Sequence, residues 1–327
     1  MKIALVTPAG PGTRNGNRHT ALRWAAFLRA AGHKVSVSTE ETCSGADLML
    51  ALHARRSHAS IKAFPDDKPL VVALTGTDVY RDIGASREAQ ESLELARRLI
   101  VLQPRAADEL PARLRKKVRV VVQSSATRLR HRPVKAPFRV CVIGHLRAEK
   151  DPLRTLSALQ FLPQDLRIEV IHLGAALDPK LAPRTKDPRY RWLGSVPHAR
   201  ALRWLASSHA MVISSRMEGG ANVVCEALRV GVPVLASRIS GNVGLLGAGY
   251  RGYFPVGDER ALAQLLTSAA TDGRFYRQLK RQMKKLRGLV APHAEKRALL
   301  AVISSPGLPR RNATLPRATP RAGRRSS

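Results

Sequence analysis

Residues 214–228 have the sequence Ser214-Ser215-Arg216-Met217-Glu218-Gly219-Gly220-Ala221-Asn222-Val223-Val224-Cys225-Glu226-Ala227-Leu228, which joins the end of a strand to the start of a helix. An apolar run precedes a short polar turn with two glycines, and a helical pattern follows. Glycines let the backbone approach a ligand, and a helix start offers free N–H groups to an anion. Seven residues separate the two glutamates, so a carboxylate stands at each end of this anion cradle. The stretch is consistent with a binding site for a ligand that has hydroxyl groups on both sides of a phosphate. It is also consistent with an ordinary helix N-terminus that has an acidic residue near its dipole.

Strand and helix patterns alternate on both sides of this stretch. The predicted strands cover 2–7, 35–38, 46–52, 70–74, 99–102, 118–122, 138–143, 166–173, 190–193, 210–214 and 233–236. The predicted helices cover 17–31, 58–64, 87–97, 104–110, 152–162, 199–207, 221–230, 258–270, 275–289 and 295–303. Single helices between strands are typical of parallel, doubly wound sheets. The sequence therefore predicts an α/β fold with two facing Rossmann-like domains and a central cleft at the carboxyl ends of both sheets, where such sheets bind ligands.

Composition marks the domain boundaries. We predict an N-terminal domain over 1–123, a linker over 124–137, a C-terminal domain over 138–290, a last helix over 291–304 and a tail over 305–327. The linker is rich in arginine and contains prolines, which interrupts the strand–helix alternation. The tail is rich in proline, arginine and serine without an acidic residue, so we expect it to be disordered.

The charge balance limits the classes of partner. The 327-residue chain has a formal net charge of +32, which attracts anions and favours non-specific binding of nucleic acid at low salt. Aromatic residues make up only 4% of the chain, so the stacking platforms of single-strand binders are missing, and we expect no specific nucleic-acid partner. No apolar run approaches the roughly 18 residues of a membrane span, so stable membrane insertion is not expected. The cysteines Cys43, Cys141 and Cys225 are scattered and odd in number, which favours the cytosol over a disulfide framework or a metal site.

The stretch 214–228 closely resembles the E-x7-E signature of GT-B glycosyltransferases, chiefly the retaining, family-4-like group. The resemblance implies that Glu218 contacts the sugar of a nucleotide-sugar donor and that Glu226 binds its ribose hydroxyls. It also implies that the backbone after the first glutamate holds the distal phosphate. The residues expected there are Gly219, Gly220, Ala221 and Asn222. In the family, the last helix crosses back onto the first domain.

Residues 144–152 follow the first strand of the second domain and resemble the G-x-L-x-x-x-K segment of the same family. This resemblance implies that Arg147 and Lys150 neutralise the donor diphosphate, with His145 beside it. Fixed cations stabilise the charge that builds on the leaving phosphate when the sugar–phosphate bond breaks. No metal or other cofactor is then required, and the chain has no Asp-x-Asp pair placed to hold a metal. Residues 192–196, including Leu193, resemble the strand and turn that border the nucleotide base.

The loop between the first strand and the first helix is long, glycine-rich and basic, which suits an anionic acceptor. The acceptor-binding residues predicted from it are Gly12, Arg14, Gly16, Asn17, Arg18 and His19.

Further acceptor contacts are predicted on the same rim. Residues 75–78 resemble the H-G-x-D loop of the family with threonine in place of histidine, and they include Thr77 and Asp78. Asp78 fits a catalytic or acceptor-orienting group and equally well a cap of the next turn. His53 ends a strand there and fits either an acceptor contact or a structural role. Near the linker, Ser124 and Ser125 replace the V-x-N-G-V-D pattern common in the family, and their hydroxyls suit an oxyanion.

The segments 7–20 and 74–80 resemble the selenosugar synthases of selenoneine biosynthesis. This resemblance implies a UDP-sugar donor, UDP-N-acetylglucosamine, and selenophosphate as the nucleophile that forms a 1-seleno-sugar. A selenium nucleophile is already anionic, so Asp78 would then position the acceptor instead of acting as a strong base. Two alternatives stay open: a family-4-like transferase acting on a lipid or polysaccharide hydroxyl, and a binder of nucleotide sugars or nucleic acid without catalysis.

Overall fold

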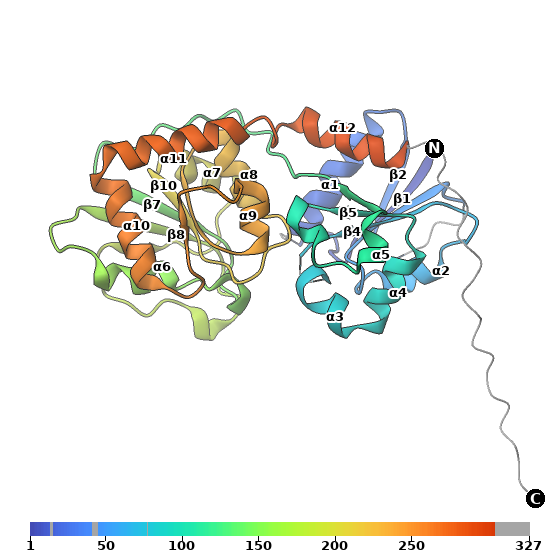
Figure 1. Ribbon diagram of the computed structural model, residues 1–327, viewed down its shortest axis with the longest axis horizontal. Coiled ribbons are helices and arrows are strands. Elements are labelled where there is room, and N and C mark those ends of the chain that lie inside the picture. Colours follow the sequence, from blue (N-terminus) through green and yellow to red (C-terminus); the bar gives the residue numbers. More distant parts are fainter. Residues whose placement is uncertain (14–15, 41–44, 77, 305–327) are drawn as a thin grey trace, which may run out of the picture.

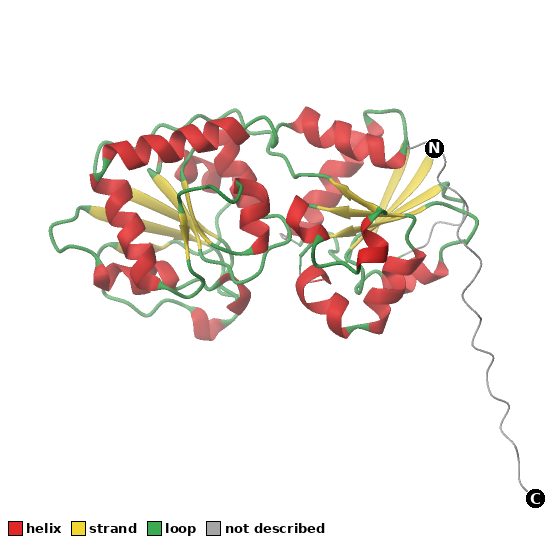
Figure 2. Ribbon diagram, in the orientation of Figure 1, coloured by secondary structure: helices red, strands yellow, loops and turns green. Residues whose placement is uncertain are grey.

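The computed structural model describes residues 1–13, 16–40, 45–76 and 78–304. The chain forms two α/β domains that lie side by side (Figure 1). Each domain contains a six-stranded sheet in which every neighbouring pair is parallel, with helices packed around it (Figure 2). The predicted fold class of two Rossmann-like domains is thereby confirmed. Over the described ranges, every helix is too short or too polar to cross a membrane. The predicted tail, residues 305–327, lies outside these ranges.

The N-terminal sheet has the strand order β2-β1-β3-β4-β5-β6. Its strands are β1 (Lys2–Val6), β2 (Lys34–Ser38), β3 (Leu48–Leu52), β4 (Leu70–Leu74), β5 (Arg98–Val101) and β6 (Val118–Val120). The helices and helical turns of this domain are α1 (Gly16–Arg29), α2 (His58–Ala63), η1 (Asp78–Asp82), α3 (Ile83–Ala85), α4 (Arg87–Leu95), η2 (Pro104–Ala107) and α5 (Ala112–Arg115). Every residue of β3 and β4 is buried, because helices cover both faces of a parallel sheet and its central strands are apolar throughout.

The C-terminal sheet has the order β12-β11-β10-β7-β8-β9. Its strands are β7 (Phe138–Ile143), β8 (Ile168–Leu173), β9 (Tyr190–Trp192), β10 (Ala210–Ile213), β11 (Val234–Ser237) and β12 (Tyr253–Phe254). The helices and turns that follow β7 are η3 (Ala148–Lys150), α6 (Arg154–Ala158), η4 (Leu159–Phe161), η5 (Pro179–Leu181), α7 (His198–Ser207), α8 (Asn222–Val230), α9 (Ser240–Leu246), α10 (Glu259–Thr271), α11 (Gly273–Leu286) and α12 (Pro292–Ile303). Strand order reverses between β7 and β10, and such a switch point opens a crevice for ligands at the carboxyl ends of the strands.

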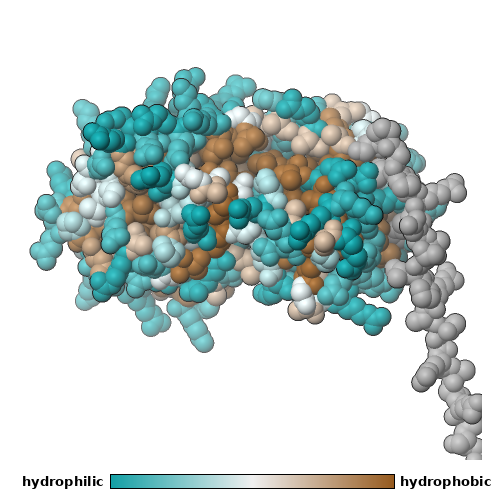
Figure 3. All heavy atoms as spheres, viewed as in Figure 1, coloured by the Kyte–Doolittle hydropathy of each residue, from teal (hydrophilic) through white to brown (hydrophobic). Residues whose placement is uncertain are grey.

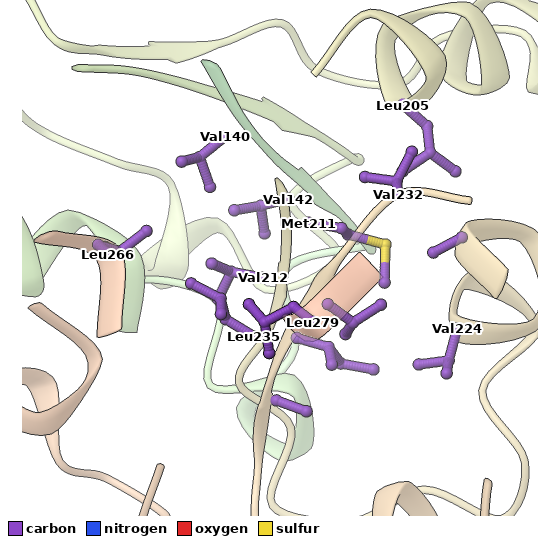
Figure 4. Close-up of a cluster of buried hydrophobic side chains, with 14 of the residues drawn as sticks. Val140, Val142, Leu205, Met211, Val212, Val224, Val232, Leu235, Leu266 and Leu279 are labelled. Atoms are coloured by element: carbon purple, nitrogen blue, oxygen red, sulfur yellow. The ribbon is translucent and has the colours of Figure 1, made fainter. Parts of the chain in front are cut away.

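The core of the C-terminal domain lies between this sheet and its helices (Figure 4). Val142 of β7 and Val212 of β10 are buried in the same cluster as Leu279 of α11. β-branched residues pack well on a pleated strand, which accounts for their frequency in β7 and β10. The sheet is therefore rigidly backed, and the loops at its carboxyl edge start from fixed positions.

Most predicted elements agree with the structure to within a few residues, but α9, β12, η1, α3 and α5 were not predicted. The stretch 240–250 reads as a loop because it contains four glycines. In the structure, two of these glycines belong to α9, where neighbouring atoms leave no room for a Cβ. A Cβ on Gly241 would lie 2.0 Å from the carbonyl oxygen of Glu218, and one on Gly244 would lie 1.6 Å from Oε1 of Gln103. Small residues here serve packing, so their number does not indicate a loop.

Helix α12 packs onto the N-terminal domain, as Figure 1 shows, although it follows the C-terminal one in sequence. Its residue Glu295 is 1% exposed and receives an unusual number of donors. Trp24 Nε1 lies 2.7 Å from one oxygen, and Arg23 approaches both oxygens at 2.8 and 3.1 Å. The amide and the hydroxyl of Ser124 also donate to this carboxylate. Glu295 therefore fastens together the first helix, the interdomain linker and the last helix.

We predict that Glu295→Gln lowers the free energy of unfolding by about 2 kcal/mol, because a buried guanidinium and a buried indole lose a charged acceptor. Thermal or urea unfolding followed by circular dichroism measures this change. Glu109→Gln is the matched control, since Glu109 is exposed on the same domain. Equal stability of the two variants would contradict the role assigned to Glu295.

Candidate active site

The two loops at the switch point of the C-terminal sheet bring oppositely charged side chains together. Lys150, after β7, contacts Oε1 of Glu218, after β10, through its Nζ. The hydroxyl of Ser215 donates to the same oxygen at 2.6 Å. The structure thus places the predicted phosphate-binding lysine next to the predicted sugar-binding glutamate. Their charges neutralise each other.

Backbone and hydroxyl contacts fix both loops. The amide of Arg216 donates to the carbonyl of Glu149 at 2.9 Å, and the hydroxyl of Ser214 donates to the carbonyl of Asp151 at 2.8 Å. Arg147 is less constrained, because its guanidinium is 44% exposed. Its ion-pair partner, Glu149, lies 3.3 Å away and is itself one-third exposed. An exposed ion pair of this kind contributes little, so Arg147 can turn toward a ligand.

Helix α8 begins next to these loops. Gly219 and Gly220 lead into Ala221, which precedes its first residue, Asn222, and no side chain caps this helix start. Its first N–H groups, together with the helix dipole, favour an anion. The N-terminus of α1 from the other domain lies opposite, since a Cβ on Gly16 would be 3.6 Å from Nδ2 of Asn222. Two helix starts from two domains therefore face one another beside Lys150.

The second glutamate of the motif has a histidine partner that sequence reasoning missed. Nε2 of His198, at the start of α7, lies 2.8 Å from Oε1 of Glu226. This hydrogen bond raises the pKa of His198 above its ordinary value. The ring of His19, from α1 of the opposite domain, lies 5.9 Å from that of His198. Burial and then the charge of His198 lower the pKa of His19, so the predicted acceptor residue His19 sits at the donor side of the cleft as a neutral ring.

Three loops at the carboxyl ends of β7, β8 and β9 are tied together near the predicted base site. Nδ1 of His145 accepts from the amide of Ala175 at 3.0 Å, and the amide of Leu193 donates to the carbonyl of His172 at 2.9 Å. Gly174 is required between them, because a Cβ there would lie 1.9 Å from the carbonyl oxygen of Gly144. His145 and Leu193 thus shape this edge of the domain, and their contact with a base stays a prediction.

The two domains touch across the predicted cleft at their loop tips. A Cβ on Gly219 would lie 2.5 Å from the carbonyl oxygen of Thr75 and 2.6 Å from Gly76 in the N-terminal domain. A Cβ on Gly220 would lie 2.5 Å from Cβ of Leu102. Helix α9, on the side that faces the N-terminal domain in Figure 1, packs against η2. The glycines of the motif are therefore needed for contact with the other domain, in addition to any contact with a ligand.

The structure corrects the expectation of Asp78 as a catalytic base. Asp78 is fully buried, and its carboxylate accepts hydrogen bonds from backbone amides of its own domain. The donors are Ala54 at 3.2 Å, Thr75 at 2.9 Å, Gly76 at 2.7 Å and Val79 at 3.2 Å. Because its oxygens already accept these hydrogen bonds and its side chain has no solvent exposure, Asp78 is committed to the scaffold of its own domain. Asp78 shapes the 75–79 turn that meets Gly219.

Three other predicted acceptor positions are committed to the scaffold. His53 is 2% exposed with a φ of 74°, and its Nδ1 accepts from the amide of Arg56 at 3.3 Å. Burial lowers the pKa of His53, so the ring is neutral. Ser124 donates to Glu295, and the amide of Ser125 donates to the carbonyl of Val290 at 3.2 Å. A structural role is therefore favoured for all three.

The remaining acceptor residues lie on the loop before α1 or at its start. Gly12 has a φ of 84°, and Gly16, Asn17, Arg18 and His19 form the first turn of α1. Arg14 and Thr77 lie outside the described residues. Within the described part of the chain, no group of three or more histidine, cysteine, aspartate or glutamate residues is arranged to hold a metal ion.

Arg23, which the sequence did not single out, links the site to the scaffold. Its guanidinium is held by Glu295, and its Nη2 lies 3.5 Å from Oδ1 of Asn222 at the start of α8. Both partners come from segments far away in sequence, and only the burial of Glu295 on α12 brings them together. A basic residue within a predicted helix carries no signal that could have revealed this contact.

Comparison with known proteins agrees with this geometry. Residues 125–286, which contain both motif loops and the whole of α8, match the family model described as "Glycosyl transferases group 1". The C-terminal domain belongs to the group 1 glycosyltransferases. No curated protein sequence matches the chain.

Solved structures extend the likeness to both domains. HepE from Anabaena, solved with UDP, has a TM-score of 0.74 at 17% identity, covering 93% of this chain and 100% of that one. HepE has also been solved with UDP-glucose. Sucrose-phosphate synthase from Thermosynechococcus elongatus has a TM-score of 0.71 at 16% identity, covering 92% of this chain and 98% of its own. A glycosyltransferase from Rickettsia africae has a TM-score of 0.68 at 13% identity, covering 93% and 99%. At these identities the likeness establishes the GT-B fold.

We predict that Gly219→Ala holds the domains apart, because its Cβ would collide with the backbone of the 75–76 turn. Small-angle X-ray scattering should show a larger radius of gyration, and sugar transfer should fall on the order of tenfold or more, since small misplacements of reacting groups are costly.

Gly249→Ala is the control, because Gly249 has open space around its Cβ position. A Gly219→Ala variant with the scattering profile and activity of this control would contradict the proposed contact.

Proposed function

We propose that the protein transfers a sugar, N-acetylglucosamine, from a UDP-sugar to selenophosphate. Selenium attacks the anomeric carbon, the bond from that carbon to the UDP oxygen breaks, and UDP leaves with the bonding electrons. Loss of phosphate from the resulting sugar selenophosphate, by hydrolysis of the P–Se bond, gives a 1-seleno-sugar.

The donor half of the proposal rests on the switch-point loops. Lys150, Arg147 and the two helix starts supply positive potential beside one another, which suits a diphosphate. Glu218 and Glu226 stand at the two ends of this region and suit the hydroxyls of a sugar and of a ribose. When the donor enters, Lys150 leaves Glu218 for the phosphate, and the freed carboxylate accepts from the sugar. UDP and UDP-glucose complexes of the structurally similar HepE agree with a uridine nucleotide.

The structural observation behind the acceptor half is the burial of Asp78. A hydroxyl acceptor must lose a proton during transfer, and Asp78 is occupied by backbone amides. A selenophosphate nucleophile is anionic from the start and needs no base. Its negative charge suits the basic loop before α1, and the resemblance of segments 7–20 and 74–80 to selenosugar synthases points to the same acceptor.

The decisive experiment measures UDP release from UDP-N-acetylglucosamine with and without selenophosphate, with mass spectrometry of the product. We expect release only with selenophosphate and a product containing selenium. Lys150→Ala should lower kcat strongly with a smaller change in KM, because the lysine stabilises charge that develops on the leaving group. Turnover onto a lipid or polysaccharide without selenophosphate would support the hydroxyl-acceptor alternative, and binding without any turnover would support a binder.

The contact between His198 and Glu226 predicts a pH dependence of UDP binding. Glu226 raises the pKa of His198 from 6.5, and ribose binding to Glu226 would displace the imidazole and restore the ordinary value. UDP binding then releases a proton, so affinity rises as pH increases from 6.5 through the raised pKa and levels off above it. Calorimetry on the wild type and on His198→Gln measures this effect, and the variant corrects for titration of the UDP phosphate. Identical pH profiles for the two proteins would refute the displacement.

A further inference from the structure

A second basic feature lies on the C-terminal domain, at the end of α8 remote from the candidate active site. It is a groove of about 320 Å³ between the linker, the end of α8 and the outer face of α11. The groove is lined by Arg130, His131, Leu228, Val230, Gly231, Lys280, Arg281, Lys284 and Arg287. Because Leu228 and Val230 lie six and eight residues after Asn222 on α8, the groove is separated from the predicted phosphate site by roughly 9 to 12 Å of helix. It therefore stays accessible when the active site is occupied.

The positive charge of this groove is not neutralised. Among the described residues, no carboxylate lies within ion-pair distance of any of its five lysines and arginines. The sequence explains this, since the three segments that line the groove contain no aspartate or glutamate over 110–148, 227–257 and 273–294. Burial lowers the pKa of His131 to about 4, so this ring is neutral and adds no charge. The groove is thus a local concentration of cations inside a basic protein.

The groove has an apolar floor and leucines at its margins. Leu228 and Val230 line it from α8, and both are nearly completely buried. Leu129 directly precedes the lining residue Arg130, and Leu289 lies two residues after the lining residue Arg287. The two leucines are 36% and 51% exposed. Figure 3 shows hydrophilic side chains along α11 and a hydrophobic patch beside the end of this helix that is nearer to α12. Cations therefore occur here beside an apolar patch, and two exposed leucines flank the lining residues in sequence.

We propose that this face docks on the headgroups of an anionic phospholipid bilayer, with one headgroup phosphate in the groove. Basic side chains that surround an apolar surface are typical of interfacial binding to anionic lipids. The volume is near the lower limit of small-molecule sites, roughly 300 Å³, and leaves room for a single headgroup. The docking is peripheral, and it leaves the active-site loops free because they lie at the opposite end of α8.

Single-stranded nucleic acid fits this face less well. Binding of unpaired bases depends on aromatic side chains that stack on them, and no aromatic residue other than His131 lines the groove. The exposed leucines would also gain nothing from a wholly polar strand, whereas they can enter the boundary between headgroups and acyl chains.

Co-sedimentation with phosphatidylcholine vesicles, with and without phosphatidylglycerol, tests the proposal on the full chain. The wild type should bind the anionic vesicles only. The double variant Lys280→Glu/Lys284→Glu should bind them more weakly, on the order of tenfold or more, because two attractive charges become repulsive. Leu129→Ser/Leu289→Ser should weaken binding at high salt, where screening leaves the apolar contact as the main term.

The matched control is Lys34→Glu/Lys116→Glu, which changes the net charge equally at two exposed sites of the N-terminal domain. Melting temperature and UDP binding should be the same in the groove variant and the control, which separates docking from folding and from the proposed catalytic function. Equal loss of vesicle binding in both charge variants would overturn the proposal, as would wild-type binding that is indifferent to phosphatidylglycerol. A groove-dependent affinity for a single-stranded oligonucleotide without vesicle binding would also overturn it.

Discussion

The close contact between the turn at Thr75–Gly76 and the turn at Gly219–Gly220 is the constraint on which the candidate site depends. Backbone meets backbone there, and only glycine leaves enough space. Each turn is held by its own contacts. Backbone amides of the first turn donate to Asp78. Glu218, in the second turn, is held by Ser215, Lys150 and the β10 loop. Each domain therefore preorganises one half of the site, and the two halves meet at these turns.

The sheets and the motif loops were predictable from sequence because their signals are local. Apolar runs of four or five residues mark β4, β7 and β10, and the E-x7-E stretch directly follows one of them. Parallel strands place all such loops at one edge, so the proximity of residues 144–150 and 214–221 follows from topology alone. Local pattern and tertiary arrangement agree at these places.

Long-range polar pairing could not be predicted, because it depends on which side chains become buried together. Glu295 looks like an ordinary charged residue of an exposed helix, yet α12 lies against α1 and gives this carboxylate five donors. His198 follows a turn that the sequence linked only to the nucleotide base, and its partner Glu226 comes from another helix. Asp78 is a mixed case: the amide of Ala54 reaches it only because β3 pairs with β4, whereas its other donors lie within three residues, as the cap interpretation allowed.

The contact between Lys150 and Glu218 also bears on which anions do not bind at the site. Inorganic phosphate can draw the lysine away, but it carries no sugar hydroxyls for Glu218 and leaves this buried acid without its counter-charge. A sugar attached to the phosphate compensates both partners at once. Under the proposed function, mutual neutralisation of the two side chains disfavours binding of small anions to the site of a highly cationic protein.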